Sequence, residues 1–246
     1  MHYSHLSLSY STDRLRAISA VARKFGQGSS ARYYAGLWAE HLPSQLLWEA
    51  NHDDHGLQKA TRAAKYVAPT WSWASMEGPI SYSWTDSDSI AYQMLNVVVE
   101  NRVSSDDFSD VVGAELRLRT LTLHARLAKH ERSSQSWWAT DTVTHPESDR
   151  SWLSEPQEGS GDEYQSWCPT FVDLESGKEW SDLSGQWDES IAGNRAVLLA
   201  QITVDRGLIL RMQPHSMKKY TRVGIFRLDT YMEDDHRWKQ RDVVIV

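Results

Sequence analysis

A single cysteine, Cys168, occurs among the 246 residues, so the chain has no internal disulfide. One lone thiol is typical of a reducing compartment, and we expect a cytoplasmic protein. Long hydrophobic runs are lacking too: runs such as Ala196–Ala200 are far too short to cross a bilayer. The first residues also lack the positive and then apolar layout of a signal peptide. We therefore predict no contact with membranes.

Positive charge is in the minority. The chain has 26 Lys and Arg against 33 Asp and Glu, which gives a net charge of −7, and it contains no long basic block. Because nucleic-acid affinity comes mainly from Lys and Arg that neutralise phosphates, we predict no nucleic-acid partner. A Gly-rich phosphate loop, a dinucleotide fingerprint and a nucleophile elbow are absent as well, so we expect no cofactor.

Two short segments contain residue types that bind metals. His52–His55 combines imidazoles with carboxylates, but its spacing fits no standard zinc frame. Consecutive acidic residues in a polar loop are normally solvated, and Asp234–His236 is a weaker candidate still. We expect no metal site.

Phenylalanine is scarce, with 4 residues, whereas Trp and Tyr number 12 and 10. Trp and Tyr combine a large apolar body with one polar atom, so they suit pocket walls and interfaces as well as cores. A core that needed only bulk would use Phe, which has no indole N–H to satisfy. Two interpretations stay open: a Trp-rich core, or a cavity walled by Trp and Tyr.

Helical spacing is confined to the first 50 residues, which we predict as a helical lead-in. One helix begins after Thr12-Asp13 and ends at Gly26. Its apolar positions are Leu15, Ile18, Ala22 and Phe25. A second short helix carries Leu42, Leu46, Leu47 and Trp48, with Pro43 in its first turn.

From Tyr66 onward, short β-rich runs separated by turn residues predict a β body over 66–246. We expect a mostly β, α+β single domain over 1–246, with a closed or sandwich-like antiparallel body. Apolar alternation slips by one residue at Thr120, which indicates a bulge or a crossing between sheets. The predicted strands are 80–84, 90–103, 114–128, 195–204, 207–212, 220–228 and 243–246, with 196–200 as a central strand.

A long loop over 130–165 interrupts the β body. It is rich in Ser, Glu and Asp, lacks clean periodicity and contains several Trp residues. Long loops in compact domains are usually functional or disordered, and we expect a lid that orders on a ligand.

Several segments in fixed order resemble one known family. These are Asp13–Ala22, Tyr34–Trp38, Leu46–Trp48, Ala68–Ser75, Gly78–Ile80, Gly207–Leu210 and Tyr220–Phe226. Together they resemble the region downstream of the HET domain in fungal heterokaryon-incompatibility-type proteins, over nearly the whole chain. Pro-Thr-Trp-Ser-Trp-Ala-Ser, within Ala68–Ser75, is the most specific piece.

The resemblance implies no catalytic residues. In the family, the upstream HET domain is held responsible for cell-death signalling, and this chain begins just where that domain would have ended. We therefore expect a stand-alone tail whose function follows from its own chemistry.

The candidate catalytic residues each have a structural alternative. His124 is a candidate acid or base, or else a surface or hydrogen-bonded His. Arg222 is a candidate buried cation for an enolate or carboxylate, or else part of a strand-end salt bridge. Asp173 shares a strand face with Glu175, and such a pair divides acid and base roles when burial separates their pKa values.

The candidate substrate-binding residues are aromatic: Trp71, Trp73, Trp84, Trp137, Trp138 and Tyr220. Trp71 and Trp73 lie two residues apart, so they share a face if the segment is extended. They form either an aromatic wall against a ligand or a clamp between the helical lead-in and the β body.

Two functions stay open. The first is binding of an apolar small molecule in a Trp/Tyr-lined β cavity, with cofactor-independent cyclase or isomerase chemistry of fungal secondary metabolism. The second is a non-enzymatic interaction or regulatory module related to the HET-type proteins. We favour the first, because the signalling domain is missing. Neither the substrate nor the oligomeric state follows from the sequence.

Overall fold

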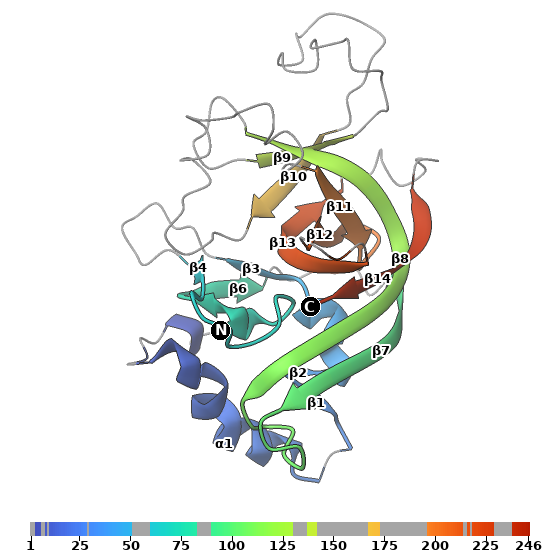
Figure 1. Ribbon diagram of the computed structural model, residues 1–246. Coiled ribbons are helices and arrows are strands. Elements are labelled where there is room, and N and C mark those ends of the chain that lie inside the picture. Colours follow the sequence, from blue (N-terminus) through green and yellow to red (C-terminus); the bar gives the residue numbers. More distant parts are fainter. Residues whose placement is uncertain are drawn as a thin grey trace, which may run out of the picture.

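A computed structural model shows a mostly β protein with short helices at its start, as predicted (Figure 1). The structure describes residues 3–5, 8, 10–28, 30–50, 60–82, 90–129, 137–141, 167–172, 196–213, 216, 218–228 and 238–246. For 5, 11, 126–129, 137–141, 167–172 and 196 it describes the backbone alone. Among the described residues, no helix is both long and apolar enough to span a membrane.

The helical elements are α1 (Arg14–Gly26), α2 (Leu42–Gln45) and the 3-10 turns η1 (Tyr3–His5), η2 (Ser11–Asp13), η3 (Ala39–His41) and η4 (Trp73–Ser75). Short strands of the first part are β1 (Tyr33–Tyr34), β2 (Leu37–Trp38), β3 (Trp48–Ala50), β4 (Thr61–Arg62), β5 (Met76–Glu77) and β6 (Ile80–Tyr82). The body contains β7 (Tyr92–Asn101), β8 (Val111–Lys129), β9 (Trp137–Asp141), β10 (Trp167–Val172), β11 (Ala196–Gln201), β12 (Arg206–Met212), β13 (Lys219–Arg227) and β14 (Lys239–Ile245).

The body closes into a barrel. Strands β8, β11, β12, β13 and β14 pair in this order, and β14 pairs back onto β8. Neighbours in a ring can all be antiparallel only when the number of strands is even. This ring is odd, and the required parallel pair is β13–β14, which joins Lys219 to Val244 and Tyr220 to Ile245. The predicted closed body is confirmed, with this one departure from antiparallel pairing.

Strand β8 changes partners around Thr120 and Thr122, where the sequence predicts a bulge or a crossing. Its pairing with β7 ends at Thr120, and its pairing with β11 begins at Thr122. Pairing with β14 continues across these residues without a register shift, so the feature is a crossing and not a bulge. Both Thr side chains are buried, and their hydroxyls donate to the carbonyls of Gln201 and Lys239.

Strand β11 is buried on both faces, which confirms the predicted central strand. Leu198 and Ala200 pack in the large core that continues into the helical lead-in. Val197 and Leu199 point the other way, into a second core that includes Phe226 of β13. Because alternate residues of a strand face opposite sides, only a strand covered on both faces tolerates such an apolar run.

The lead-in packs against the body through the first core. Leu46, Trp48, Trp71 and Trp73 are all almost fully buried there, beside apolar residues of the barrel. The tip of the β7–β8 hairpin also meets the lead-in: Phe108 stacks on Tyr33 of β1 with 4.7 Å between the ring centroids, and Asp106 forms an ion pair with Arg23 of α1. These contacts favour the interpretation of Trp71 and Trp73 as a clamp between the lead-in and the body over their interpretation as an aromatic wall against a ligand.

Three local expectations were wrong. The segment around Trp71 and Trp73 is not an extended strand: Ser72 caps the turn η4, and its Oγ accepts from the N–H of Ala74 at 3.1 Å. Part of the predicted loop 130–165 forms β9, which pairs with β8 and β10. Phe25 of α1 is 78% exposed, because the last turn of the helix extends past the core that buries Leu15.

Candidate functional site

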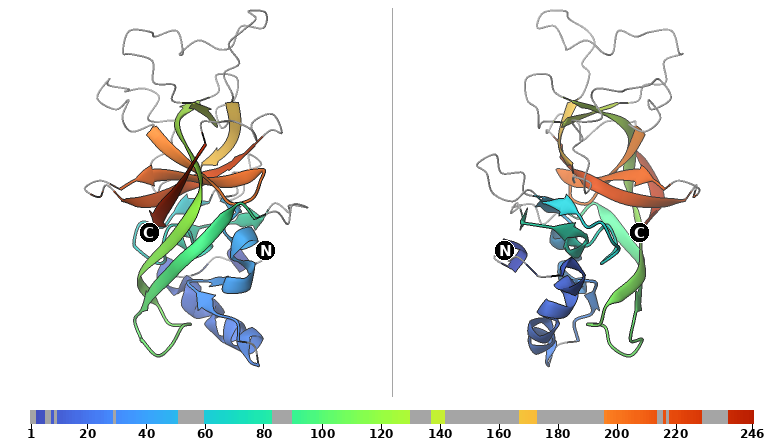
Figure 2. Two further views of the ribbon diagram at one scale, coloured as in Figure 1. Left: turned by 90° about the vertical axis from the view of Figure 1, so that its right-hand side faces the viewer. Right: turned by 60° about the vertical axis from the view of Figure 1, so that its left-hand side comes forward.

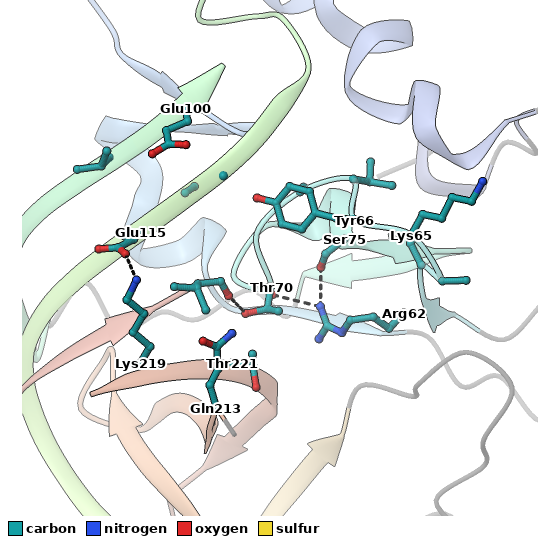
Figure 3. A pocket seen from close by; sticks show the side chains of 18 residues that line it. Arg62, Lys65, Tyr66, Thr70, Ser75, Glu100, Glu115, Gln213, Lys219 and Thr221 are labelled. Carbon is teal, nitrogen blue, oxygen red and sulfur yellow. Dashed lines mark hydrogen bonds and ion pairs between the residues drawn. The ribbon is translucent and has the colours of Figure 1, made fainter. Parts of the chain in front are cut away.

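A cleft of about 670 Å³ lies where three parts of the chain meet (Figure 3). One side is the segment from Arg62 to Ser75, which contains the whole Pro-Thr-Trp-Ser-Trp-Ala-Ser motif; Thr70 and Ser75 are the motif residues that line the cleft. The second side is the paired region of β7 and β8, and the third is formed by Gln213, Lys219 and Thr221 at the turn between β12 and β13. This volume is within the usual range for sites that hold a small molecule.

Thr70 anchors the floor of the cleft. Its backbone N–H donates to the carbonyl of Val246 at 3.1 Å, and its hydroxyl donates to the same oxygen. The hydroxyl oxygen also accepts from the backbone N–H of Arg222 at 3.0 Å. One threonine therefore joins the motif segment to β13 and to the end of β14.

Arg62 crosses the same floor as a second fixed element. Its guanidinium donates to the hydroxyl of Ser75 at 2.7 Å, to the carbonyl of Arg222 at 3.0 Å and to the carbonyl of Thr70 at 3.5 Å. A planar guanidinium bonded to several fixed acceptors has little freedom left. The floor is thus rigid before any ligand arrives.

The wall formed by β7 and β8 is acidic. Glu115 forms an ion pair with Lys219 of β13, whereas the carboxylate of Glu100 has no hydrogen bond or ion pair with any described residue. Glu100 lies over Gly113, where a Cβ would stand 3.1 Å from its Oε2. Glycine at this position leaves room for the carboxylate above the strand.

Tyr66 forms the rim of the cleft, and its side chain is 55% exposed. In Figure 3 its hydroxyl points toward the space bounded by Glu100 and Gln213. Partial burial and the nearby Glu100 carboxylate together raise the pKa of Tyr66 to about 12. The phenol is therefore protonated at neutral pH and offers both a donor and an acceptor.

The chemistry of the cleft is that of hydrogen bonding beside a flat aromatic ring. Its groups are hydroxyls, an amide, the Glu115–Lys219 ion pair, the cations of Arg62 and Lys65, and the Glu100 carboxylate, which no described residue pairs. Within the described part of the chain, no cluster of three or more His, Cys, Asp or Glu residues is arranged to hold a metal ion. No Trp is among the described residues that line it.

The motif tryptophans lie behind the cleft in the core. Trp73 donates its indole N–H to the carbonyl of Gly36 at 2.9 Å. The carbonyl of Trp71 accepts the indole N–H of Trp48 at 3.0 Å. These contacts hold the segment whose Thr70 and Ser75 line the cleft.

Arg222 is a buried cation, as the sequence suggested, but its side chain does not line the cleft. Its guanidinium donates to the carbonyls of Leu46 and Trp48, and the residue as a whole is 1% exposed. Tyr220 is half-buried against the first core and does not line the cleft.

His124 lies apart from Arg222, on the exposed part of β8. Its Nε2 is 2.9 Å from a guanidinium nitrogen of Arg241, so this ring nitrogen accepts and the proton is on Nδ1. Burial, with the charges of Arg241 and Lys239, lowers the pKa of His124. The structure does not bring the two predicted catalytic residues together.

The remaining predicted residues cannot be placed in the same way. Asp173, Trp84 and the segment His52–His55 lie outside the described residues. For Trp137 and Trp138 only the backbone is described, in β9, where they pair with Thr170 and Pro169 of β10.

Sequence reasoning missed Arg62, Tyr66, Thr70 and Ser75 as cleft residues. A signal for two of them was present, because Thr70 and Ser75 are polar positions inside the most specific motif. Comparison of the chain with family models, with curated proteins and with solved structures finds no match in any of the three.

Proposed function

We propose that the protein binds a small organic molecule in the cleft between Tyr66, Gln213 and the β7–β8 wall. The observation that carries this proposal is the rigid floor, in which Thr70 and Arg62 are fixed by bonds to three separate parts of the chain. A floor built in this way holds hydrogen-bonding groups in place without a ligand, which lowers the cost of binding.

The lining favours a ligand with a flat apolar part and polar substituents. The exposed ring of Tyr66 offers a stacking surface, while Gln213 and Lys219 offer donors and acceptors at the other side. This amends the apolar ligand expected from the sequence, because the described lining mixes apolar and polar groups.

The test uses ligand-observed NMR on the full chain with a fragment set of aromatic acids, aromatic amines and phenols. Tyr66→Ala and Gln213→Ala are expected to abolish or weaken the hits by at least about tenfold, as loss of an aromatic contact and a hydrogen bond predicts. Tyr10→Ala is the matched control, because Tyr10 is 70% exposed and does not line the cleft. Hits that survive both cleft variants would contradict the proposal.

Cofactor-independent isomerase or cyclase chemistry stays a further proposal for the same cleft. Glu100 is the group we would test as a base, since among the described residues it has no ion-pair partner, and Tyr66 is the adjacent proton donor. Glu100→Gln is expected to keep binding of a fragment and to lose turnover of any substrate identified from it. Asp107→Asn, an exposed acid of the same hairpin, is the control.

A second candidate function is protein interaction, as the resemblance to HET-type proteins suggests. The favouring observation is the apolar surface of α1, where Val21 is 53% and Phe25 is 78% exposed beside Lys24. Amine crosslinking in an extract of the source cells is expected to join Lys24 to one recurring protein. Phe25→Asp should abolish that crosslink and Tyr10→Asp should keep it; crosslinks that persist in Phe25→Asp would exclude this surface.

A further inference from the structure

Among the described residues, strand β7 has a hydrogen-bonding partner on one edge only. It pairs with β8 from Tyr92 to Asn101, and no described residue bonds to the main chain along its other edge. An open edge presents a row of N–H and C=O groups that is a template for another strand. Figure 2 (left) shows β7 along the side of the molecule, with β8 beside it.

This edge lacks most of the devices that keep strands from pairing. Tyr92–Asn101 contains no Lys, Arg or Pro, and its one charged residue is Glu100. Register shifts lie at Leu95 and just after Glu100. They leave Asn96–Glu100, the sequence Asn-Val-Val-Val-Glu, as a regular stretch.

We propose that this edge pairs with the same edge of a second copy of the chain, antiparallel and about a two-fold axis at Val98. In that register Val98 faces its own copy, and Asn96 faces Glu100 of the second copy on both sides of the axis. Asn96, Val98 and Glu100 share the exposed face of β7, and Val98 is 45% exposed. Each Asn amide then donates to a carboxylate, and the two Val side chains cover each other.

The residues themselves favour this register over the one centred on Val97. A shift that centres the axis on Val97 would place Asn96 against Val98, and Glu100 against Met94 beyond the bulge at Leu95. Both polar side chains would then lose their partners. A closed two-fold contact of this kind is also the commonest way in which identical chains associate.

The pairing would reach the cleft. Val98 and Glu100 line its β7 wall, so Asn96 of the second copy would stand at the rim beside Glu100. The proposal does not depend on a ligand, and it assigns the oligomeric state that the sequence leaves open.

Sedimentation equilibrium of the full chain tests this directly. The unmodified chain is expected to form a dimer that depends on concentration. Val98→Lys and Val98→Glu should each weaken the dimer by at least about tenfold, because like charges would meet on the axis. An equal mixture of the two variants should recover the dimer, since the opposite charges then face each other. Val112→Lys is the control: it is 50% exposed, but it lies on β8, away from the open edge.

Melting temperatures of the variants exclude misfolding as the reason for any loss. A chain that stays monomeric at its highest soluble concentration would overturn the proposal, as would a dimer unchanged by Val98→Lys. A mixture that fails to recover the dimer would reject the axis at Val98. A dimer broken by Phe25→Asp and not by Val98→Lys would place the contact on α1 instead.

Discussion

The guanidinium of Arg222 lies on the indole of Trp48, with its central carbon 3.3 Å from the ring centroid. The same guanidinium donates to the carbonyl of Trp48 and, at 2.9 Å, to the carbonyl of Leu46. Arg222 belongs to the barrel, whereas the other two residues belong to the lead-in. A cation buried on an aromatic face is strongly attracted to the ring, and here it also satisfies two backbone acceptors. This contact joins the two parts of the molecule.

Replacement of Arg222 by Met is therefore expected to lower the free energy of unfolding by at least about 2 kcal/mol, since two buried carbonyls lose their donors. Urea unfolding followed by Trp fluorescence measures it. Arg117→Met is the matched control, because Arg117 is exposed on β8 and should change stability by no more than about 0.5 kcal/mol. Equal effects of the two substitutions would refute a structural role for Arg222.

Gly207 and Gly113 should differ sharply in their tolerance of alanine. A Cβ at Gly207 would stand 2.2 Å from the carbonyl oxygen of Ala200 and 2.6 Å from the ring of Phe226. Backbone and a core ring cannot move away cheaply, so Gly207→Ala should destabilise the protein by about 1–3 kcal/mol or more. At Gly113 the nearest atom is the flexible Glu100 carboxylate, and Gly113→Ala should be tolerated. Thermal unfolding of Gly207→Ala and Gly113→Ala tests this difference. Similar melting temperatures of the two variants would show that the packing between β11 and β12 is looser than described.

His124 should titrate below its ordinary pKa of about 6.5. Burial is the main cause of the lowered pKa, so Arg241→Gln is expected to raise the pKa of His124 only part of the way back to its ordinary value. Arg117→Gln, on the opposite face of β8, should leave the pKa of His124 unchanged. The folded state favours the neutral ring. Below the ordinary pKa the unfolded chain binds a proton that the folded chain resists, so stability is lost as pH falls from about 6.5. NMR titration of the His124 ring proton measures the pKa, and a value above 6.5 would contradict the geometry with Arg241.

The lead-in and the body should unfold together. Because Leu46 and Trp48 are bonded to Arg222, the helices have no separate core to keep when the barrel opens. Limited proteolysis is expected to yield no folded N-terminal fragment, and the circular dichroism and fluorescence transitions should coincide. A stable fragment over roughly the first 65 residues would show two domains instead of one.

The fold was more accessible from the sequence than the site. The apolar run in β11 predicts a strand covered on both faces, and the slip near Thr120 predicts the crossing in β8. Both predictions work because buried positions are apolar, so the spacing of apolar residues shows which face of a strand is buried. The turn at Trp73 was missed because the hydroxyl of Ser72 caps it, and such side-chain bonds override strand propensity. The cleft was missed for another reason: Arg62 meets Arg222 only after the barrel closes, and no periodicity records a contact between such distant segments.

The most direct test of the proposed function is amide NMR of the full chain, titrated with the best fragment from the screen. The account predicts that the largest shifts fall on Tyr66, Thr70 and Gln213, with smaller shifts on the β8 residues around Glu115. Tyr66→Ala should remove these shifts without changing the rest of the spectrum. Shifts centred on His124 and Arg241, or on Val21 and Phe25 of α1, would place binding elsewhere and contradict the assignment of the cleft.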